Sequence, residues 1–195
     1  MKINFPLASF LTIVLVLVAA AAGFGQTSPS KYIDNTKVGI SNFGKMDDRF
    51  YRGARPGKKD FATLKEIGIN TIIDLTDNSP DEKDLAEAAG LNYVNIPIKD
   101  KSYPTDEAVA AFLKTVNDTS TGVFYVHCAG GRHRTGVMGA VYRFKYDKWN
   151  LDQVLAEMDQ YEFGSGMGHG KQRDFVKDYW KQFQANTVAV AASKN

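Results

Sequence analysis

The stretch GVFYVHCAGGRHRTGVMG at 122–139 constrains the fold of this chain more than any other part of it. It begins as a continuous apolar run, which is typical of a strand buried on both faces of a sheet. Glycines then mark a turn, and helical spacing of apolar residues begins near residue 135. A buried strand that leads through a tight turn into a helix is the unit from which parallel α/β sheets are built.

The same alternation of strands and helices covers most of the 195 residues. Further strands are predicted near 49–53, 70–76 and 91–98. Helices are predicted over 58–68, 79–90 (with Ser79 as N-cap), 104–118, 135–147, 151–163 and 171–184. We therefore predict a single α/β domain at 42–184, with a central, mostly parallel sheet flanked by helices. A linker at 27–41 precedes it, and a flexible tail at 185–195 follows.

Residues 1–26 have a different composition, with one lysine near the start, an apolar run from Phe5 to Ala22 and small residues after it. This layout is typical of a secretory signal peptide, and an uncleaved N-terminal anchor is the alternative. Either one predicts that the domain is exported, as a periplasmic, secreted or outward-facing anchored protein. The net charge of +2 gives no indication of a nucleic-acid partner. We expect a monomer that touches no membrane beyond that possible anchor.

Cys128 is the only cysteine, and it lies where the predicted strand meets the glycine turn. Backbone N–H groups in a turn at a helix N-terminus form an anion site, to which Arg134 can add a bidentate contact. The same groups favour a thiolate at Cys128. A thiolate at the base of an anion-binding loop suits attack on phosphorus, which gives a phosphocysteine that water then hydrolyses.

The run from His127 to Thr135 resembles the H-C-x-x-G-x-x-R-T signature of the cysteine-dependent protein tyrosine phosphatase superfamily, in its compact dual-specificity branch. NFGKMDDRFYRGARP at 42–56 is similar to the opening of small bacterial members. The resemblance implies that Cys128 is the nucleophile, that Arg134 binds the phosphoryl group and that Thr135 donates a hydrogen bond to the sulfur. His127 would hold the loop. Backbone N–H groups would bind phosphate from Ala129, Gly130, Gly131, Arg132 and His133.

A general acid is also needed, because the leaving oxygen must be protonated. The resemblance implies an Asp on a loop upstream of the cysteine, and Asp100, 28 residues before Cys128, fits best. Asp106 competes, but its place in the first turn of a helix gives it a simpler role. Asp74 and Asp77 are weaker rivals, better suited to ending a strand and forming a turn.

The chemistry implied by the resemblance requires no cofactor and no metal, and His127, His133 and His169 lack the close spacing of a metal site. Arg52 and Arg55 are expected to pair with acidic side chains. GSGMGHGKQR at 164–173 departs from a Walker loop and is interpreted as a helix connector or a loop near the site. Its cations either hold an anionic substrate or face solvent; they are His169, Lys171 and Arg173. The aromatic residues from 142 to 180 are expected to pack in the core.

Two substrate classes fit these residues. A chain of this length has little spare sequence to wall the deep cleft of a phosphotyrosine enzyme, and a shallow site would suit phosphoserine, phosphothreonine and phosphotyrosine alike. Phosphotyrosine or broader phosphoprotein substrates are expected first, because export would separate the enzyme from cytosolic inositol pyrophosphates. GRHRTG at 131–136 is similar to the GKHRTG of plant and fungal phosphatases that act on inositol pyrophosphates, and Lys99 and Lys101 flank Asp100. Inositol polyphosphates or pyrophosphates are therefore the alternative. A pseudophosphatase that binds phosphate with weak turnover, and a rhodanese-like sulfur carrier, are the alternatives from other classes.

Overall fold

The computed structural model describes residues 38–164 and 167–193. The predicted signal peptide or anchor at 1–26 lies outside the described residues, as does most of the predicted linker. The described residues form a five-stranded sheet of order β1-β2-β5-β3-β4. Its strands are β1 (Gly44–Lys45), β2 (Phe50–Ala54), β3 (Thr71–Asp74), β4 (Asn92–Asn95) and β5 (Phe124–Cys128). All pairs are parallel except β1 with β2, which confirms the predicted mostly parallel sheet.

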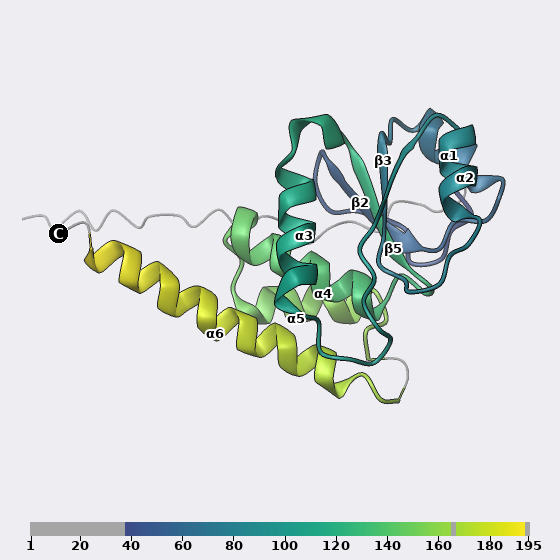
Figure 1. Cartoon of the computed structure of the whole chain (residues 1–195). Coiled ribbons are helices and arrows are strands. Elements are labelled where there is room, and N and C mark those ends of the chain that lie inside the picture. Colours follow the sequence, from purple (N-terminus) through teal and green to yellow (C-terminus); the bar gives the residue numbers. More distant parts are fainter. Residues whose placement is uncertain (1–37, 165–166, 194–195) are drawn as a thin grey trace, which may run out of the picture.

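Helices cover both faces of the sheet (Figure 1). One face carries α1 (Asp60–Glu66) and α2 (Glu82–Ala88). The other carries α3 (Asp106–Asn117), α4 (His133–Tyr142), α5 (Leu151–Gln160) and α6 (Gly170–Ala192). A π-helical segment, Arg143–Asp147, extends α4. The predicted single α/β domain with helices around a central sheet is confirmed.

The central position of β5 in the sheet explains why its sequence is apolar throughout. Phe124, Val126 and Cys128 belong to the larger core cluster, under α3 to α6, whereas Tyr125 belongs to the smaller cluster under α1 and α2. Successive side chains of a strand point to opposite faces, so a strand covered on both faces is apolar throughout. All five of its residues are buried.

The parallel strands end at one edge of the sheet, and the loops after them meet there. In the strand register, Ala54 lies opposite Cys128, and His127 lies opposite Asp74. The loops after β2, β5 and β3 are therefore neighbours. In open α/β sheets, ligands bind at this carboxyl edge of the strands.

The domain begins earlier than the predicted boundary at 42. Val38 and Ile40, which fall in the predicted linker 27–41, are buried in the smaller core cluster. The Ala54 N–H donates to the Ser41 carbonyl at 2.9 Å. Both residues are apolar, and their burial makes this end of the predicted linker part of the domain.

Two helix boundaries also differ from prediction. The N-cap of α2 is Asp81 and not Ser79, whose hydroxyl instead contacts Arg55 and Thr76. α6 runs to Ala192, so residues 185–192 of the predicted tail are helical in the structure. Alanines favour helix, and no glycine or proline interrupts this stretch.

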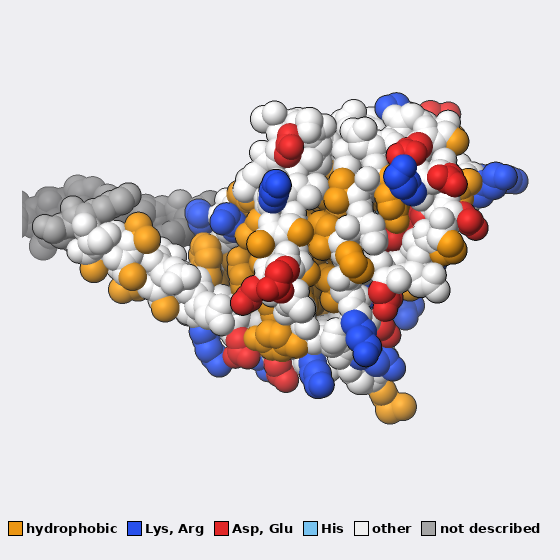
Figure 2. All heavy atoms as spheres, in the orientation of Figure 1, with side chains coloured by type: hydrophobic (Ala, Val, Ile, Leu, Met, Phe, Trp, Pro, Cys, Tyr) orange, Lys and Arg blue, Asp and Glu red, His pale blue; other side chains and the backbone are white. Residues whose placement is uncertain are grey.

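The outer end of α6 extends away from the domain, and hydrophobic side chains lie exposed along it (Figures 1 and 2). Val188 and Val190 are among the exposed apolar residues. Within the described residues, no helix is both long enough and apolar enough to cross a bilayer.

Candidate active site

The loop at 129–132 joins β5 to α4 and lies against the end of β2. Gly131 has φ = +68°, a left-handed conformation that favours glycine. A Cβ at Gly131 would lie 2.3 Å from the Gly53 carbonyl carbon and 2.5 Å from the Ala54 nitrogen. Glycine is therefore required at this position both by backbone conformation and by space.

Donors outside the loop hold its carbonyl groups. Asn42 Nδ2 donates to the Gly130 carbonyl at 2.9 Å, and Arg52 Nη2 donates to the Gly131 carbonyl at 2.8 Å. The Arg55 N–H donates to the Ala129 carbonyl at 3.3 Å. In a trans peptide the N–H points opposite to the C=O, so the N–H groups of residues 130–132 are turned to the other side. Successive N–H groups arranged in this way form an anion-binding nest.

Cys128 lies at the base of this loop and is 3% exposed. Burial raises the pKa of its thiol. The Thr135 hydroxyl and N–H, the charge of Arg134 and the Gly131 N–H together outweigh burial, so the pKa falls below its ordinary value. The site therefore favours a thiolate at Cys128.

Arg134, in the first turn of α4, lies between two carboxylates. Its Nη1 donates to the Ile98 carbonyl at 3.2 Å and lies 3.5 Å from Asp77 Oδ1. Its Nη2 lies 3.9 Å from Asp100 Oδ1. The side chains of Asp77 and Asp100 are about half exposed, at 54% and 53%. The structure thus brings Asp77, the weaker candidate from sequence, as close to Arg134 as Asp100.

The other two candidate acids have separate positions. Asp106 is the first residue of α3 and follows Thr105, whose hydroxyl accepts from the Ala108 N–H as an N-cap. Asp74 ends β3 and is fully buried. It accepts hydrogen bonds from the Thr76 N–H and the Tyr93 hydroxyl, each at 2.8 Å. Burial raises the pKa of Asp74, but His127, Ser79 and Thr76 lower it to below its ordinary value.

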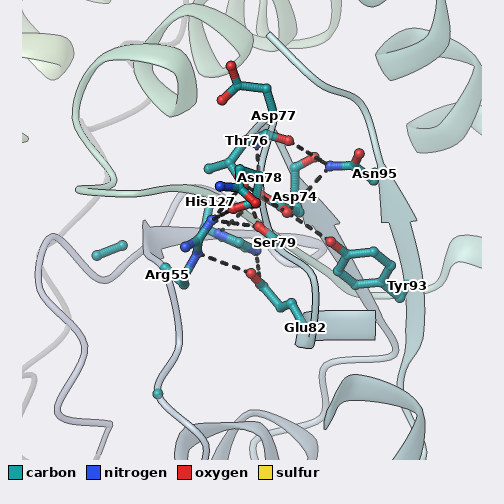
Figure 3. A network of polar contacts seen from close by, with 12 residues as sticks. Arg55, Asp74, Thr76, Asp77, Asn78, Ser79, Glu82, Tyr93, Asn95 and His127 are labelled. Carbon is teal, nitrogen blue, oxygen red and sulfur yellow. Dashed lines mark hydrogen bonds and ion pairs between the residues drawn. The ribbon is translucent and has the colours of Figure 1, made fainter. Parts of the chain in front are cut away.

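His127 is buried in a polar network on the α2 side of the sheet (Figure 3). Its Nε2 lies 2.6 Å from Glu82 Oε1, and its Nδ1 lies 3.8 Å from Asp74 Oδ1. Arg55 Nε lies 3.2 Å from Glu82 Oε2, which confirms the predicted pairing of Arg55 with an acid. Sequence reasoning missed Glu82, because an acid in the first turn of a helix is ordinary.

The network also contains a possible metal-ligand set, since Asp74, Glu82 and His127 place ligand atoms within 4.8 Å of one another. Nε2 and Oε1 are in direct contact at 2.6 Å, whereas a zinc ion between them would hold them further apart. Both carboxylates already have donors from this chain. The arrangement fits an ion-pair network better than a metal centre.

The described part of the connector at 164–170 lies beside the site. The ring of His169 stacks on His133, with centroids 3.3 Å apart and planes at 3°. Burial and the His169 ring lower the pKa of His133 to about 4. A Cβ at Gly168 would lie 3.1 Å from Lys101 Cδ, so the connector also borders the loop of Asp100. Arg173 pairs with Asp159 at 2.5 Å.

The expectation that Arg52 pairs with an acid is wrong. No ion pair among the described residues includes it. Besides the Gly131 carbonyl, its guanidinium lies over the ring of Tyr161, with its central carbon 3.8 Å from the centroid. The expected packing of the aromatic residues is confirmed, since they lie in or against the larger core cluster or are buried beside it.

Comparison with known proteins places the chain in a family. Residues 32–178 match the family described as "DSP-PTPase phosphatase fused to NAD+ Kinase". Inositol diphosphatase DSP3 of Arabidopsis thaliana is 31% identical over 140 residues, which cover 69% of this chain and 66% of that protein.

Two solved structures are similar in fold. TpbA of P. aeruginosa has a TM-score of 0.65 at 21% identity, covering 78% of this chain and 91% of that one. The core catalytic domain of the PP-IP phosphatase Siw14 from S. cerevisiae has a TM-score of 0.64 at 16% identity, covering 79% of this chain and 94% of that one. With the family match, the chain belongs to the dual-specificity-type phosphatases of the cysteine-dependent protein tyrosine phosphatase superfamily.

Proposed function

We propose that the chain hydrolyses phosphate monoesters through a phosphocysteine on Cys128. The observation that supports this most is the position of the buried thiol, at the base of a loop whose carbonyls at 129–131 are held by outside donors. The phosphoryl oxygens would bind the loop N–H groups and the Arg134 guanidinium. The thiolate would attack phosphorus, and the leaving oxygen would take a proton from an Asp. Water would then cleave the S–P bond, with phosphate and the free thiolate as products.

Turnover of para-nitrophenyl phosphate without added metal tests this chemistry. Cys128→Ser should abolish turnover but keep phosphate or vanadate binding, and Arg134→Ala should weaken both. Full activity of Cys128→Ser would refute the mechanism. An inactive wild type that still binds phosphate would favour the pseudophosphatase. A persulfide on Cys128 after incubation with thiosulfate would favour the sulfur carrier.

Asp100 is the proposed general acid, and Asp77 becomes its main rival because of its distance to Arg134. Replacing the acid slows esters with poor leaving groups far more than activated aryl esters, because only the former need the proton. Asp100→Asn should show this selective loss, by about 100-fold. Asp77→Asn and Asp106→Asn are the matched comparisons. A selective loss in Asp77→Asn alone would move the role to that residue.

Phosphotyrosine in proteins is the substrate proposed first. The carboxylates beside Arg134 are half exposed, so the site is open to a phosphorylated side chain on a protein surface. Inositol diphosphates are the second candidate. The identity with DSP3 supports them, and so do Lys99 and Lys101, which are exposed on either side of Asp100.

A panel of phosphopeptides and phosphorylated inositols separates the two classes. For a phosphotyrosine enzyme, kcat/KM should be highest with phosphotyrosine peptides and change little in Lys101→Ala. Higher kcat/KM with inositol diphosphates, together with a selective loss of that activity in Lys101→Ala, would favour the second class. Increased anionic charge on the substrate should then raise the sensitivity of KM to salt.

Export of the enzyme is proposed from the apolar run at 5–22 in the sequence. Expression in a bacterial host followed by cell fractionation and N-terminal sequencing tests it. A mature chain that starts near residue 23 or 26 outside the cytoplasm is the expected result. A chain that keeps its full N-terminus and stays in the cytoplasm would overturn the proposal.

A further inference from the structure

Arg52 is a buried cation beside the candidate active site with no acidic partner of its own among the described residues. It lies in β2, in register with Val126 of β5, and is 1% exposed. Its described contacts are the hydrogen bond to the Gly131 carbonyl and the ring of Tyr161. Burying an unpaired charge costs several kcal/mol. A residue with that cost calls for a compensating interaction.

The helix packed over Arg52 increases this cost. Gly136 and Gly139 of α4 lie on the guanidinium, since a Cβ at either would stand 3.8 Å from Nη2 or 3.6 Å from Nη1. The first turn of α4 carries the positive end of the helix dipole, which disfavours a cation nearby. Burial accordingly lowers the pKa of Arg52.

The charged and titratable groups that face Arg52 include the active-site cysteine. The ring of Tyr161, which follows α5, lies against the guanidinium. Burial lowers the pKa of Arg52, whereas Tyr161, Glu157 and Cys128 raise it. Glu157 is already in contact with Arg143, at 2.6 Å and 3.0 Å. Arg143 repels Arg52. Cys128, at the end of the neighbouring strand, is the group at the active site that can place a negative charge near Arg52.

We propose that Arg52 is a positioning residue of the phosphatase site, whose buried charge stabilises the anion on Cys128 and whose hydrogen bond fixes the Gly131 peptide. This inference rests on the proposed function of Cys128. Charges interact strongly where water is excluded, so a guanidinium on the core side acts on the sulfur without touching substrate. The same positive charge would also attract the negative phosphoryl group of the phosphocysteine. Arg134 contacts substrate from outside, and Arg52 supports the loop from beneath.

The test compares three substitutions by the pH dependence of Cys128 alkylation, followed by mass spectrometry. Arg52→Met removes the charge and the donor, Arg52→Gln keeps a donor without the charge, and Arg52→Lys keeps the charge. The midpoint of alkylation should rise by about one pH unit in the Met and Gln variants and stay near wild type in Lys. Turnover of para-nitrophenyl phosphate should fall by about tenfold or more in all three.

Arg49→Met is the matched control, because Arg49 precedes the same strand but is exposed. Its alkylation midpoint should equal that of wild type. If Arg52→Gln folds and its midpoint also equals that of wild type, the proposal is overturned, while Cys128→Ser decides the proposed function separately. Failure of all three Arg52 variants to fold would overturn it too, because the core would then require the arginine itself and not its charge.

Discussion

Gly131→Ala is the sharpest test of how the loop is built. Gly131 has φ = +68°, and the added methyl group would meet the Gly53 carbonyl carbon at 2.3 Å and the Ala54 nitrogen at 2.5 Å. Both atoms belong to the backbone of β2, so no side-chain rotation relieves the overlap. The loop, the strand or both must move.

The size of the effect follows from the strain of the positive φ and from the overlap with the backbone of β2. An alanine in the left-handed region costs about 1–2 kcal/mol. An ordinary contact is 3.4 Å or more, so the loop must move by roughly 1 Å to accommodate the methyl group. A displacement of about 1 Å in a catalytic group lowers the rate by about 100-fold. We expect a loss of stability of about 2 kcal/mol and a loss of kcat/KM of about 100-fold.

Gly39→Ala separates the backbone strain from the steric overlap. Gly39 also has a positive φ, at +63°, but a Cβ added there would meet no atom within 4 Å. It should lose about 1 kcal/mol and keep the kcat/KM of wild type. Urea unfolding, turnover of para-nitrophenyl phosphate and vanadate affinity would be measured for both variants. If Gly131→Ala kept kcat/KM within about threefold of Gly39→Ala, the loop would not be held against β2 as described.

Three further results are expected. Glu82→Leu should lower the free energy of unfolding by about 3 kcal/mol, because it removes the nearer carboxylate from buried His127 and the acidic partner of Arg55. In the same urea titration Glu87→Gln, which breaks an exposed pair, should change it by less than about 0.5 kcal/mol. Since the fold lowers the pKa of Cys128, wild type should gain stability relative to Cys128→Ser as the pH rises from the folded toward the unfolded thiol pKa; equal pH dependence in calorimetry would contradict this. Truncation after Gln184 should leave the melting temperature almost unchanged, because every described side chain from there on is exposed; a large drop would show that this end of α6 is packed.

The sequence predicted the parts of the fold that depend on local pattern. β5 has a continuous apolar run because both of its faces are covered, and the helix predicted at 104–118 forms as α3. β1 was not predicted, since a strand of two residues shows no periodicity. α6 runs past 184 because nothing in the sequence stops it, although its outer end buries no side chain.

The residues of the candidate site also fall into those that a local sequence pattern reveals and those that it does not. The loop and its cysteine lie in one short stretch, so the signature at 127–135 was visible in the sequence. Glu82 and Asp77 depend on contacts with residues 45 and 57 positions away, which no local pattern reveals. Arg52 and Arg55 lie three positions apart, yet only Arg55 meets an acid, because the side chain of Arg52 points under α4.

These contacts distribute charge unequally across the sheet. On the α2 side, Arg55 and His127 meet the carboxylates of Glu82 and Asp74. On the α4 side, Arg52 has no carboxylate partner among the residues that the structure describes. The carboxylates beside Arg134 are half exposed, and water screens them from the sulfur more than it screens a buried guanidinium. An anion at Cys128 therefore has the buried guanidinium of Arg52 on the core side of the loop, which favours both the thiolate and the bound phosphoryl group.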